Sequence, residues 1–379
     1  MADETILTNA TLVLPDRALA GTVVLRAGRI AEVQPGRASA AAALDLAGDY
    51  LLPGIVDVHS DNLERQAQPR TTARWPSRSA LMAHDAHCAA AGIATVLDAL
   101  CLGNLGFEED RLRTFRDGVA DLDAMADSGL LKVTHFLHLR CEVAAADMLE
   151  LFDQTAEHPL VRVVSLMDHC PGFGQYADLD RYRALRRRDG LDAAAIERHI
   201  AEAQARRARV RDANRRAVLA RMAGRGVALA SHDDRTEEEV AANAADGIGI
   251  AEFPVTMRAA ATARAHAMQV VVGAPNIVRG GSHSGNVAAA ELVRAGAVDA
   301  FASDYVPVSL VEAAFLCAAE GALSLPESIR LITERPARLA GLDDRGRIAL
   351  GLRADLVRVR VHDGLPVVRQ AWRGGDRVA

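Results

Sequence analysis

The stretch Leu52-Pro53-Gly54-Ile55-Val56-Asp57-Val58-His59-Ser60-Asp61 predicts how this protein folds. An apolar strand leaves a Pro-Gly turn and ends on a histidine and a carboxylate two residues apart. Because such side chains share one face of a strand, His59 and Asp61 present a nitrogen and an oxygen to one point beyond its carboxyl end. Parallel α/β barrels build active sites there, and nitrogen and oxygen ligands suit Zn²⁺, Mn²⁺ or Fe²⁺. An isolated His-x-Asp is more often a surface loop, so the rest of the chain must decide.

The bulk composition is that of a globular enzyme. The 379 residues are 50% hydrophobic, and a net charge of −6 offers no basic field for nucleic acid or an anionic membrane. The acidic start resembles no signal peptide, and the five scattered cysteines form no C-x-x-C pair, which is typical of reduced thiols. We therefore expect a cytoplasmic protein that acts on a small molecule, with no nucleic-acid or membrane partner and with a homodimer as the working expectation.

The two ends of the chain share a β-rich texture that the middle lacks. Residues 5–14, 22–33 and 354–361 are rich in Val, Leu, Ile and Thr and are separated by turn residues. We predict one small β-sandwich from residues 1–53 and 343–379, since chain termini often lie together.

The middle, residues 54–342, alternates strands with helices and predicts a (β/α)8 TIM-like barrel. Helices are expected over residues 110–127 and 198–222. Eight apolar, strand-like runs begin near Ile55, Ile93, Lys132, Leu160, Val227, Gly249, Gln269 and Ala297.

One βα unit is longer than the others. Residues 174–224 form a polar, Arg-dense insertion that includes Arg186-Arg187-Arg188. A solvated helix with i,i+4 charge pairs is the favoured interpretation, and a substrate lid is the alternative.

Metal-ligand residue types recur where successive strands end. The three histidines and three carboxylates at these positions are His59, Asp61, Glu142, His169, His232 and Asp304. Each alone is more often a satisfied polar residue, but six at one rim are hard to obtain by chance. One Zn²⁺ takes four ligands, so six suit two divalent metals about 3.5–4 Å apart that share a bridging carboxylate and a hydroxide. Zn²⁺ is the first expectation, with Mn²⁺ or Fe²⁺ as alternatives.

Glu142 is the natural bridging carboxylate. A carbamylated lysine bridges metals in some barrels, but the chain's one lysine, Lys132, lies ten residues earlier, at the start of the strand. Asp304 is expected to act also as the general base that takes the proton of the metal-activated water. Asp57, deeper on the His59 face, is interpreted as orienting that ligand, with a turn-capping role as the alternative.

These landmarks resemble the amidohydrolase superfamily. They include the P-G-x-x-D-x-H opening, the later single histidines, Ser303-Asp304 and the closing segment 351–357. The resemblance covers the whole chain, with two departures. Asp61 replaces the second histidine of the commoner H-x-H motif, so one metal site has an oxygen donor, which is a harder ligand than the imidazole nitrogen. The strand count also places His169 and His232 one strand earlier than the usual fifth and sixth, so we expect one strand to be misassigned.

A narrower resemblance is to the PhnM family of the carbon–phosphorus lyase pathway. It rests on residues 59–64, 69–70, 75–76, 83–85, 140–142, 167–172, 231–234 and, above all, 274–286. This resemblance implies hydrolysis of alpha-D-ribose 1-methylphosphonate 5-triphosphate to the 5-phosphate, with release of pyrophosphate.

The residues themselves agree with a polyanionic substrate. The string Arg279-Gly280-Gly281-Ser282 offers backbone N–H groups beside a guanidinium, as phosphate-binding loops do, although a plain turn is the alternative for the two glycines. On a continuing strand, Arg140 is expected to point to the face opposite the bridging Glu142. Its role therefore depends on how the chain turns at this point. The further expected substrate contacts are Arg70, Arg74, Asn276, His283 and Asn286.

Two other functions stay open at this point. A hydrolase of C–N bonds in cyclic amides or aminopurines would need an apolar pocket or a pocket for a single anion, and ring opening of such compounds would identify it. A metal-free scaffold protein on the same fold would show no metal in elemental analysis. The intact ligand set and the Arg/Gly-rich string favour the phosphoanhydride hydrolase.

Overall fold

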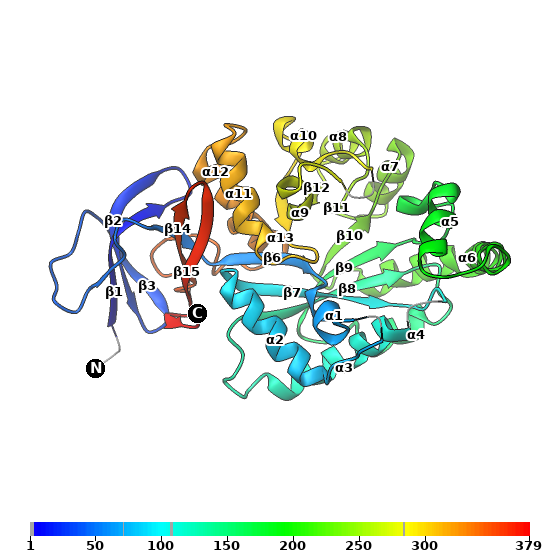
Figure 1. The fold of residues 1–379 in the computed structure, drawn as a ribbon, viewed down its shortest axis with the longest axis horizontal. Coiled ribbons are helices and arrows are strands. Elements are labelled where there is room, and N and C mark those ends of the chain that lie inside the picture. Colours follow the sequence, from blue (N-terminus) through cyan, green and yellow to red (C-terminus); the bar gives the residue numbers. More distant parts are fainter. Residues whose placement is uncertain (1–3, 71, 107–108, 283–284) are drawn as a thin grey trace.

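Eight parallel strands form the barrel, and the computed structural model describes residues 4–70, 72–106, 109–282 and 285–379. In the sheet each strand pairs with the next along the chain (Figure 1). The eight are β6 (Ile55–Ser60), β7 (Ile93–Leu102), β8 (Thr134–Glu142), β9 (Val161–Met167), β10 (Ala228–His232), β11 (Ile250–Glu252), β12 (Gln269–Gly273) and β13 (Ala300–Ala302).

The sheet closes just beyond β13. Ser60 and Asp304 form a parallel bridge. The Asp304 amide donates to the His59 carbonyl at 3.0 Å, and the Asp61 amide donates to the Asp304 carbonyl at 2.9 Å. The first and last predicted site residues are therefore neighbours across the seam.

Helices cover the outside of the barrel. In chain order they are α1 (Asn62–Ala67), α2 (Ser77–Ala90), α3 (Glu109–Met125), α4 (Met148–Thr155), η1 (Gly174–Tyr176), α5 (Leu179–Arg188), α6 (Ala193–Met222), α7 (Glu237–Ala245), α8 (Met257–Ala265), α9 (Ala274–Val278), α10 (Ala289–Arg294), α11 (Ser309–Ala319), α12 (Leu325–Arg330) and α13 (Glu334–Leu339). No helix among the described residues has both the length and the apolar character that a bilayer span requires.

The inside of the barrel is apolar at one end only. Inward side chains such as Val56, Leu97 and Val163 pack with Ala337 and Leu339 of α13 in one buried cluster. This packing fills one end of the barrel, so the polar residues at the carboxyl ends of the strands face the other end. Sites in such barrels lie at that end because the βα loops gather there.

A second sheet joins the two ends of the chain, as expected. Its strand β14 lies antiparallel to β5, and Leu356 pairs with Pro53. The strands of this sheet are β1 (Glu4–Val13), β2 (Ala18–Arg26), β3 (Arg29–Pro35), β4 (Leu44–Asp45), β5 (Tyr50–Pro53), β14 (Leu356–His362), β15 (Leu365–Arg373) and β16 (Asp376–Arg377).

Gly54 connects this sheet to the barrel. A β-carbon on Gly54 would lie 2.7 Å from the Ala94 β-carbon and 2.8 Å from that of Asp355, so only glycine fits. Its neighbours come from β7 and from the segment before β14, which means that the Pro-Gly turn fixes how the two parts pack. The limits at residues 53 and 343 remain a prediction.

The predicted strands are found with starts shifted by three residues at most. The expectation of a misassigned strand was wrong: His169 follows β9, the fourth barrel strand, and His232 ends β10, the fifth. The count made from apolar runs was right because most of these runs are largely buried on both faces, as in β7, where all ten residues are buried.

The Arg-dense segment folds as η1, α5 and α6 between β9 and β10. These helices stand on the side of the barrel opposite the second sheet (Figure 1).

Candidate metal centre and active-site cavity

Three residues at the carboxyl rim have left-handed backbone although none is glycine. The φ angles of Asp233, Phe253 and Asp304 are 56°, 55° and 55°. Each amide still bonds to the neighbouring strand, for example Asp233 N to Glu252 O at 2.9 Å. Such conformations cost of order 1–3 kcal/mol and cluster at functional sites. The chain therefore turns sharply at the points where the site residues leave the strands.

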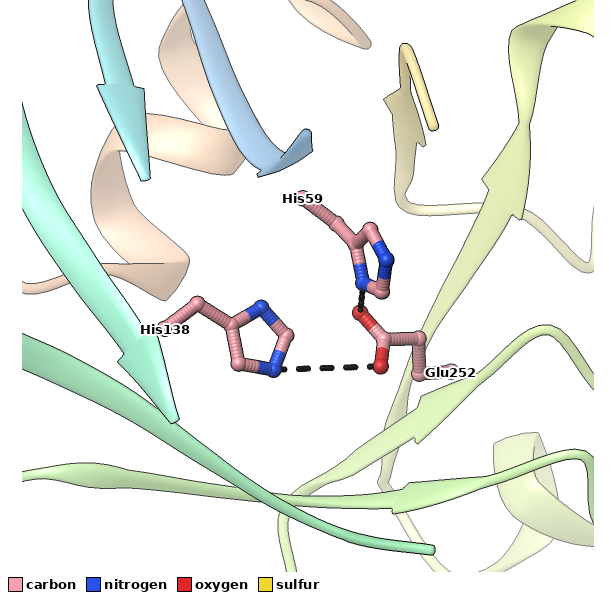
Figure 2. Close-up of side chains that lie close together, drawn as sticks. All are labelled: His59, His138 and Glu252. Carbon is pink, nitrogen blue, oxygen red and sulfur yellow. Dashed lines mark hydrogen bonds and ion pairs between the residues drawn. The ribbon is translucent and has the colours of Figure 1, made fainter. Parts of the chain in front are cut away.

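Three buried side chains from β6, β8 and β11 converge inside the barrel (Figure 2). His59 Nδ1 lies 2.8 Å from Glu252 Oε1, and His138 Nε2 lies 3.9 Å from Glu252 Oε2. The donor atoms of this set lie within 4.8 Å of one another. We call His59, His138 and Glu252 the inner cluster.

Hydrogen bonds fix which ring nitrogens the inner cluster presents. His138 Nδ1 lies 2.9 Å from the Val58 carbonyl, which can only accept, so Nδ1 carries the proton and Nε2 holds the lone pair. Burial lowers the pKa of His138 to about 3 and also lowers that of His59. Neutral imidazoles whose second nitrogen is held by an oxygen acceptor are typical metal ligands.

A second set of donors lies beside the first. His169 Nε2 and His232 Nε2 lie 3.4 and 3.6 Å from Asp233 Oδ2. We call His169, His232 and Asp233 the outer cluster. Glu252 joins the two clusters, because its Oε2 also accepts from His232 Nδ1 at 2.7 Å.

Glu142, the predicted bridge, contacts the ring of His169 through Nδ1 and accepts from its amide at 3.3 Å. This pairing lowers the pKa of Glu142. Together with the Asp233 carboxylate, Glu142 raises the pKa of His169 to about 10. Burial alone would shift each of these two pKa values in the opposite direction. In this arrangement Glu142 orients His169, and its bridging role remains a prediction.

The residues fit a divalent metal. Several buried atoms of the two clusters, and one of the nearby Asp61, have no hydrogen-bond partner within the described chain: His59 Nε2, His138 Nε2, His169 Nε2, Asp233 Oδ2 and Asp61 Oδ1. Native proteins leave few such atoms unsatisfied, and a bound cation would satisfy all of them. Imidazole and carboxylate donors suit Zn²⁺, Mn²⁺ and Fe²⁺.

Asp61, Arg140 and Asp304 lie together at the mouth of this site. Asp61 Oδ2 is 3.9 Å from Arg140 Nη1. Burial and the Asp61 carboxylate hold the pKa of Asp304 well above its usual range. Neither aspartate belongs to a cluster, so both stay predicted ligands that face the same cavity as the clusters.

The expected alternation of Arg140 was wrong. Residues 138, 140 and 142 are each two apart on β8, so all three share the face that points into the barrel. Arg140 Nε and Nη1 are buried without a hydrogen-bond partner, and the side chain lines the cavity. A cation in this position is suited to an anionic substrate.

Asp57 does not touch the ring of His59. Its Oδ1 accepts from the amides of His59 and Ser303 at 3.3 and 3.1 Å. The carboxylate therefore joins the backbones of β6 and β13, and it positions His59 through the strand instead of through the imidazole.

A cavity of about 560 Å³ is lined by the outer cluster and by His59 of the inner cluster. This volume suits a small-molecule site. The predicted substrate residues that line it are Arg140, Asn276, Arg279, Ser282 and Asn286.

Other predicted contacts lie elsewhere. Arg74 reaches α3, where it donates to Asp117 Oδ2 at 3.1 Å, and the exposed Arg70 forms a backbone bridge to Ala73. Gly280 and Gly281 turn with φ of 74° and 155° but do not line the cavity. His283 lies outside the described residues.

Sequence reasoning missed His138, Glu252 and Asp233. Glu252 ends an apolar run just as His232 and Asp304 do, so the same pattern could have found it. His138 shares the alternation of Glu142, but its position inside β8 lacks the strand-end signal that marks the other ligands. Asp233 follows His232 directly and required only the next residue to be considered.

A third set, His84, Asp98 and His135, is also close enough to hold a metal. However, its ring nitrogens are already paired: His84 with Asn62 at 2.8 Å and Asp98 at 2.7 Å, and His135 with Asp98 at 2.8 Å and Asp85 at 3.3 Å. We interpret this set as a buried ion-pair network that joins α2 to β7 and β8.

Comparison with known proteins shows what this chain is similar to. Residues 192–371 match the amidohydrolase family. The chain is 40% identical over 376 residues to alpha-D-ribose 1-methylphosphonate 5-triphosphate diphosphatase of Escherichia coli, which covers 98% of this chain and 100% of the relative.

Solved structures share the fold at low identity. N-acetyl-D-glucosamine-6-phosphate deacetylase from Mycobacterium smegmatis is 18% identical, with 99% of this chain and 100% of that chain covered and a TM-score of 0.63. N-isopropylammelide isopropylaminohydrolase from Burkholderia multivorans is 17% identical, with 100% and 98% covered and a TM-score of 0.61. These likenesses concern the fold alone.

Proposed function

Because this chain belongs to the amidohydrolase family and, within it, to the alpha-D-ribose 1-methylphosphonate 5-triphosphate diphosphatases, we propose that it hydrolyses that triphosphate to the 5-phosphate and pyrophosphate. The reaction is a step in phosphonate catabolism. The observation that carries the proposal is one cavity that joins two metal-donor clusters to the guanidinium groups of Arg111, Arg140, Arg186 and Arg279. A triphosphate that also bears a phosphonate needs such a concentration of positive charge.

Two divalent cations would be held by the inner and outer clusters, with Glu142, Asp61 and Asp304 beside them. Zn²⁺ is the first expectation, and Mn²⁺ or Fe²⁺ also suit the donors. When bound, such metals supply Lewis acidity toward phosphoryl oxygens and a nucleophilic water at neutral pH.

The chain's own residues supply the remaining functions. Asp304 faces the cavity beside Asp61, where its carboxylate can take the proton of the attacking water while the phosphoanhydride P–O bond breaks. Arg140 and Arg279 line the same cavity and can hold the phosphoryl oxygens and the departing pyrophosphate. Because pyrophosphate is a good leaving group, no general acid is required.

A turnover assay in ¹⁸O-labelled water tests the proposal. The metal-loaded enzyme is expected to give pyrophosphate and the sugar 5-phosphate by ³¹P NMR, with label in one of these two products, which also identifies the attacked phosphorus. Label in orthophosphate, or ring opening of a hydantoin-like compound without triphosphate cleavage, contradicts it.

Asp304→Asn provides the first prediction. The variant keeps the size of the side chain but removes the proton acceptor, so kcat should fall about 10²- to 10⁴-fold while the circular dichroism spectrum stays unchanged. The matched control is Asp127→Asn, which makes the same change at an exposed position. An Asp304→Asn enzyme with the kcat of the control would exclude a role as general base.

The remaining expectations stay proposals. We infer a cytoplasmic location because the five cysteines are all buried free thiols. A homodimer is the expected assembly.

A further inference from the structure

The Arg-dense insertion contributes a wall of the active-site cavity. Tyr176, Tyr182, Arg186 and His199 line the same space as the outer cluster. They come from η1, α5 and α6, the segment that the sequence favours as a solvated helix. We therefore consider what this wall can bind.

Partly buried contacts hold α6 against the barrel rim. Arg207 Nε donates to Asp168 Oδ2 at 2.6 Å, and its guanidinium carbon lies 3.4 Å from the centroid of the Phe173 ring. Gln204 donates to the Pro171 carbonyl at 3.0 Å. These partners directly flank His169, so the insertion and a candidate metal ligand are fixed relative to each other.

The insertion also meets the opposite side of the cavity. Arg181 Nη1 lies 3.0 Å from the position that a β-carbon on Gly285 would take. Gly285 belongs to the loop that brings Arg279 and Ser282 to the cavity. The helix α5 and this loop therefore touch, and the cavity lies between walls that both carry guanidinium groups.

Tyr182 contacts both Arg186 and His199, which are the cationic and the titratable side chain of the insertion wall. The side chain is buried, and its ring stacks with that of His199 at a centroid distance of 6.2 Å and an angle of 14°. The guanidinium carbon of Arg186 lies 5.0 Å from the centroid of the same ring. Burial lowers the pKa of His199, and the positive charges of Arg186 and Arg206 lower it further. Arg186 Nη1 also donates to Asp189 Oδ2 at 3.0 Å, so a carboxylate offsets part of the positive charge on this wall.

We propose that Arg186 and His199 form a phosphoryl-binding subsite, which holds a phosphate or phosphonate group of the substrate other than the one under attack. The subsite rests on the proposed function for the identity of the substrate. It makes the insertion a part of the substrate site. Arg186 supplies a planar fork of N–H donors, which suits a phosphoryl group, and His199 adds an imidazole donor.

The two reaction products separate the two anionic ends of the substrate. Pyrophosphate carries the leaving end, and ribose 1-methylphosphonate 5-phosphate carries the phosphonate end. Their dissociation constants are measured by calorimetry for the wild type and for the Arg186→Gln and His199→Asn variants. Arg187→Gln is the matched control, because it removes the same charge from the same helix at an exposed residue that does not line the cavity.

We expect Arg186→Gln to weaken binding of one product about 10- to 100-fold, with a smaller loss for His199→Asn and none for Arg187→Gln. Weakened pyrophosphate binding assigns the subsite to the leaving end, and weakened binding of the sugar product assigns it to the sugar end, which carries the phosphonate and the 5-phosphate. Unchanged binding of both products by both variants overturns the proposal. An equal loss of product affinity in Arg187→Gln also overturns it, because it would indicate only the long-range effect of removing one positive charge.

Failure of the subsite and failure of the proposed function are distinguishable. Wild-type enzyme that releases no pyrophosphate from the triphosphate contradicts the function, whatever the variants do. Weakened pyrophosphate binding by Arg186→Gln in that case still supports a phosphoryl subsite. Circular dichroism of all variants establishes that α5 and α6 remain folded.

Discussion

At the residue scale, Glu252 determines how two histidines present their nitrogens. Its two oxygens accept from Nδ1 of His59 and Nδ1 of His232, at 2.8 and 2.7 Å. With Nδ1 protonated on both rings, both Nε2 atoms keep their lone pairs for a metal. One buried carboxylate thereby sets the tautomer of a ligand in each cluster.

Glu252→Gln should therefore weaken metal binding. The amide keeps one acceptor oxygen and gains an NH₂ donor, so at least one histidine loses its acceptor and can protonate Nε2 instead. We expect metal affinity to fall about 10- to 100-fold. The measurement is metal per chain by elemental analysis after dialysis against a weak chelator. Glu150→Gln, an exposed helical glutamate, is the control, and equal metal retention in the two variants would contradict the prediction.

At the element scale, the buried side-chain amide of Asn214 attaches helix α6 to the barrel, together with the Gln204 amide, the arginine contacts and apolar packing. Asn214 Nδ2 donates to the carbonyls of Val143 and Ala145 at 3.0 and 2.9 Å, just after β8 ends. These carbonyls belong to an irregular turn, in which no strand neighbour is placed to satisfy them. The position of the insertion, and hence of one cavity wall, depends on this contact.

Asn214→Ala should loosen α6. Removing the side-chain amide leaves two buried carbonyls without their hydrogen-bond donor, which lowers the free energy of unfolding by about 2 kcal/mol. We expect faster hydrogen exchange of α6 amides and a lower free energy of unfolding in urea. Arg216→Ala, on the exposed face of the same helix, should change neither quantity. Protection of α6 that stays at the wild-type level would show that the other contacts of the helix hold it without Asn214.

At the scale of the whole molecule, the barrel contains a charged network in its otherwise apolar wall. Burial alone would lower the pKa of His135, but the Asp98 and Asp85 carboxylates raise it to about 9. The same pairing holds the pKa of Asp98 below its usual range against the effect of burial. His84 also faces Asp98, and the Asp98 charge acts on the buried Asp57 and Cys88 as well.

The raised pKa of His135 predicts a stability that depends on pH. The contribution is fully present below the unfolded-state pKa of about 6.5 and is lost as the pH rises through about 9. It amounts to roughly 3 kcal/mol in the limit. Thermal unfolding of the wild type and of His135→Asn should differ strongly at pH 6 and much less at pH 10. A difference that is constant over this range would mean that His135 is not charged in the folded protein.

The predictable part of the fold followed from burial on both faces of each barrel strand. Runs such as 93–102 are mostly apolar and wholly buried, so their number and order are visible in the chain. The same logic placed Asp304 and His232 at the rim, because each directly follows such a run. It could not place Arg74, since an arginine on a loop reaches whichever carboxylate the fold brings near, and here that is Asp117 on α3.

The sequence by itself determined the parallel barrel, the sheet made from both chain ends, the rim on which the site lies and the family resemblance at His59 and Asp61. All of these depend on periodicity and on short motifs, which are local properties of a chain. Only the tertiary structure decided that His59 meets His138 and Glu252 instead of Glu142, and that Arg186 and His199 face the cavity. Those contacts join residues far apart in the chain, and their distances depend on how the barrel closes and on where α6 docks.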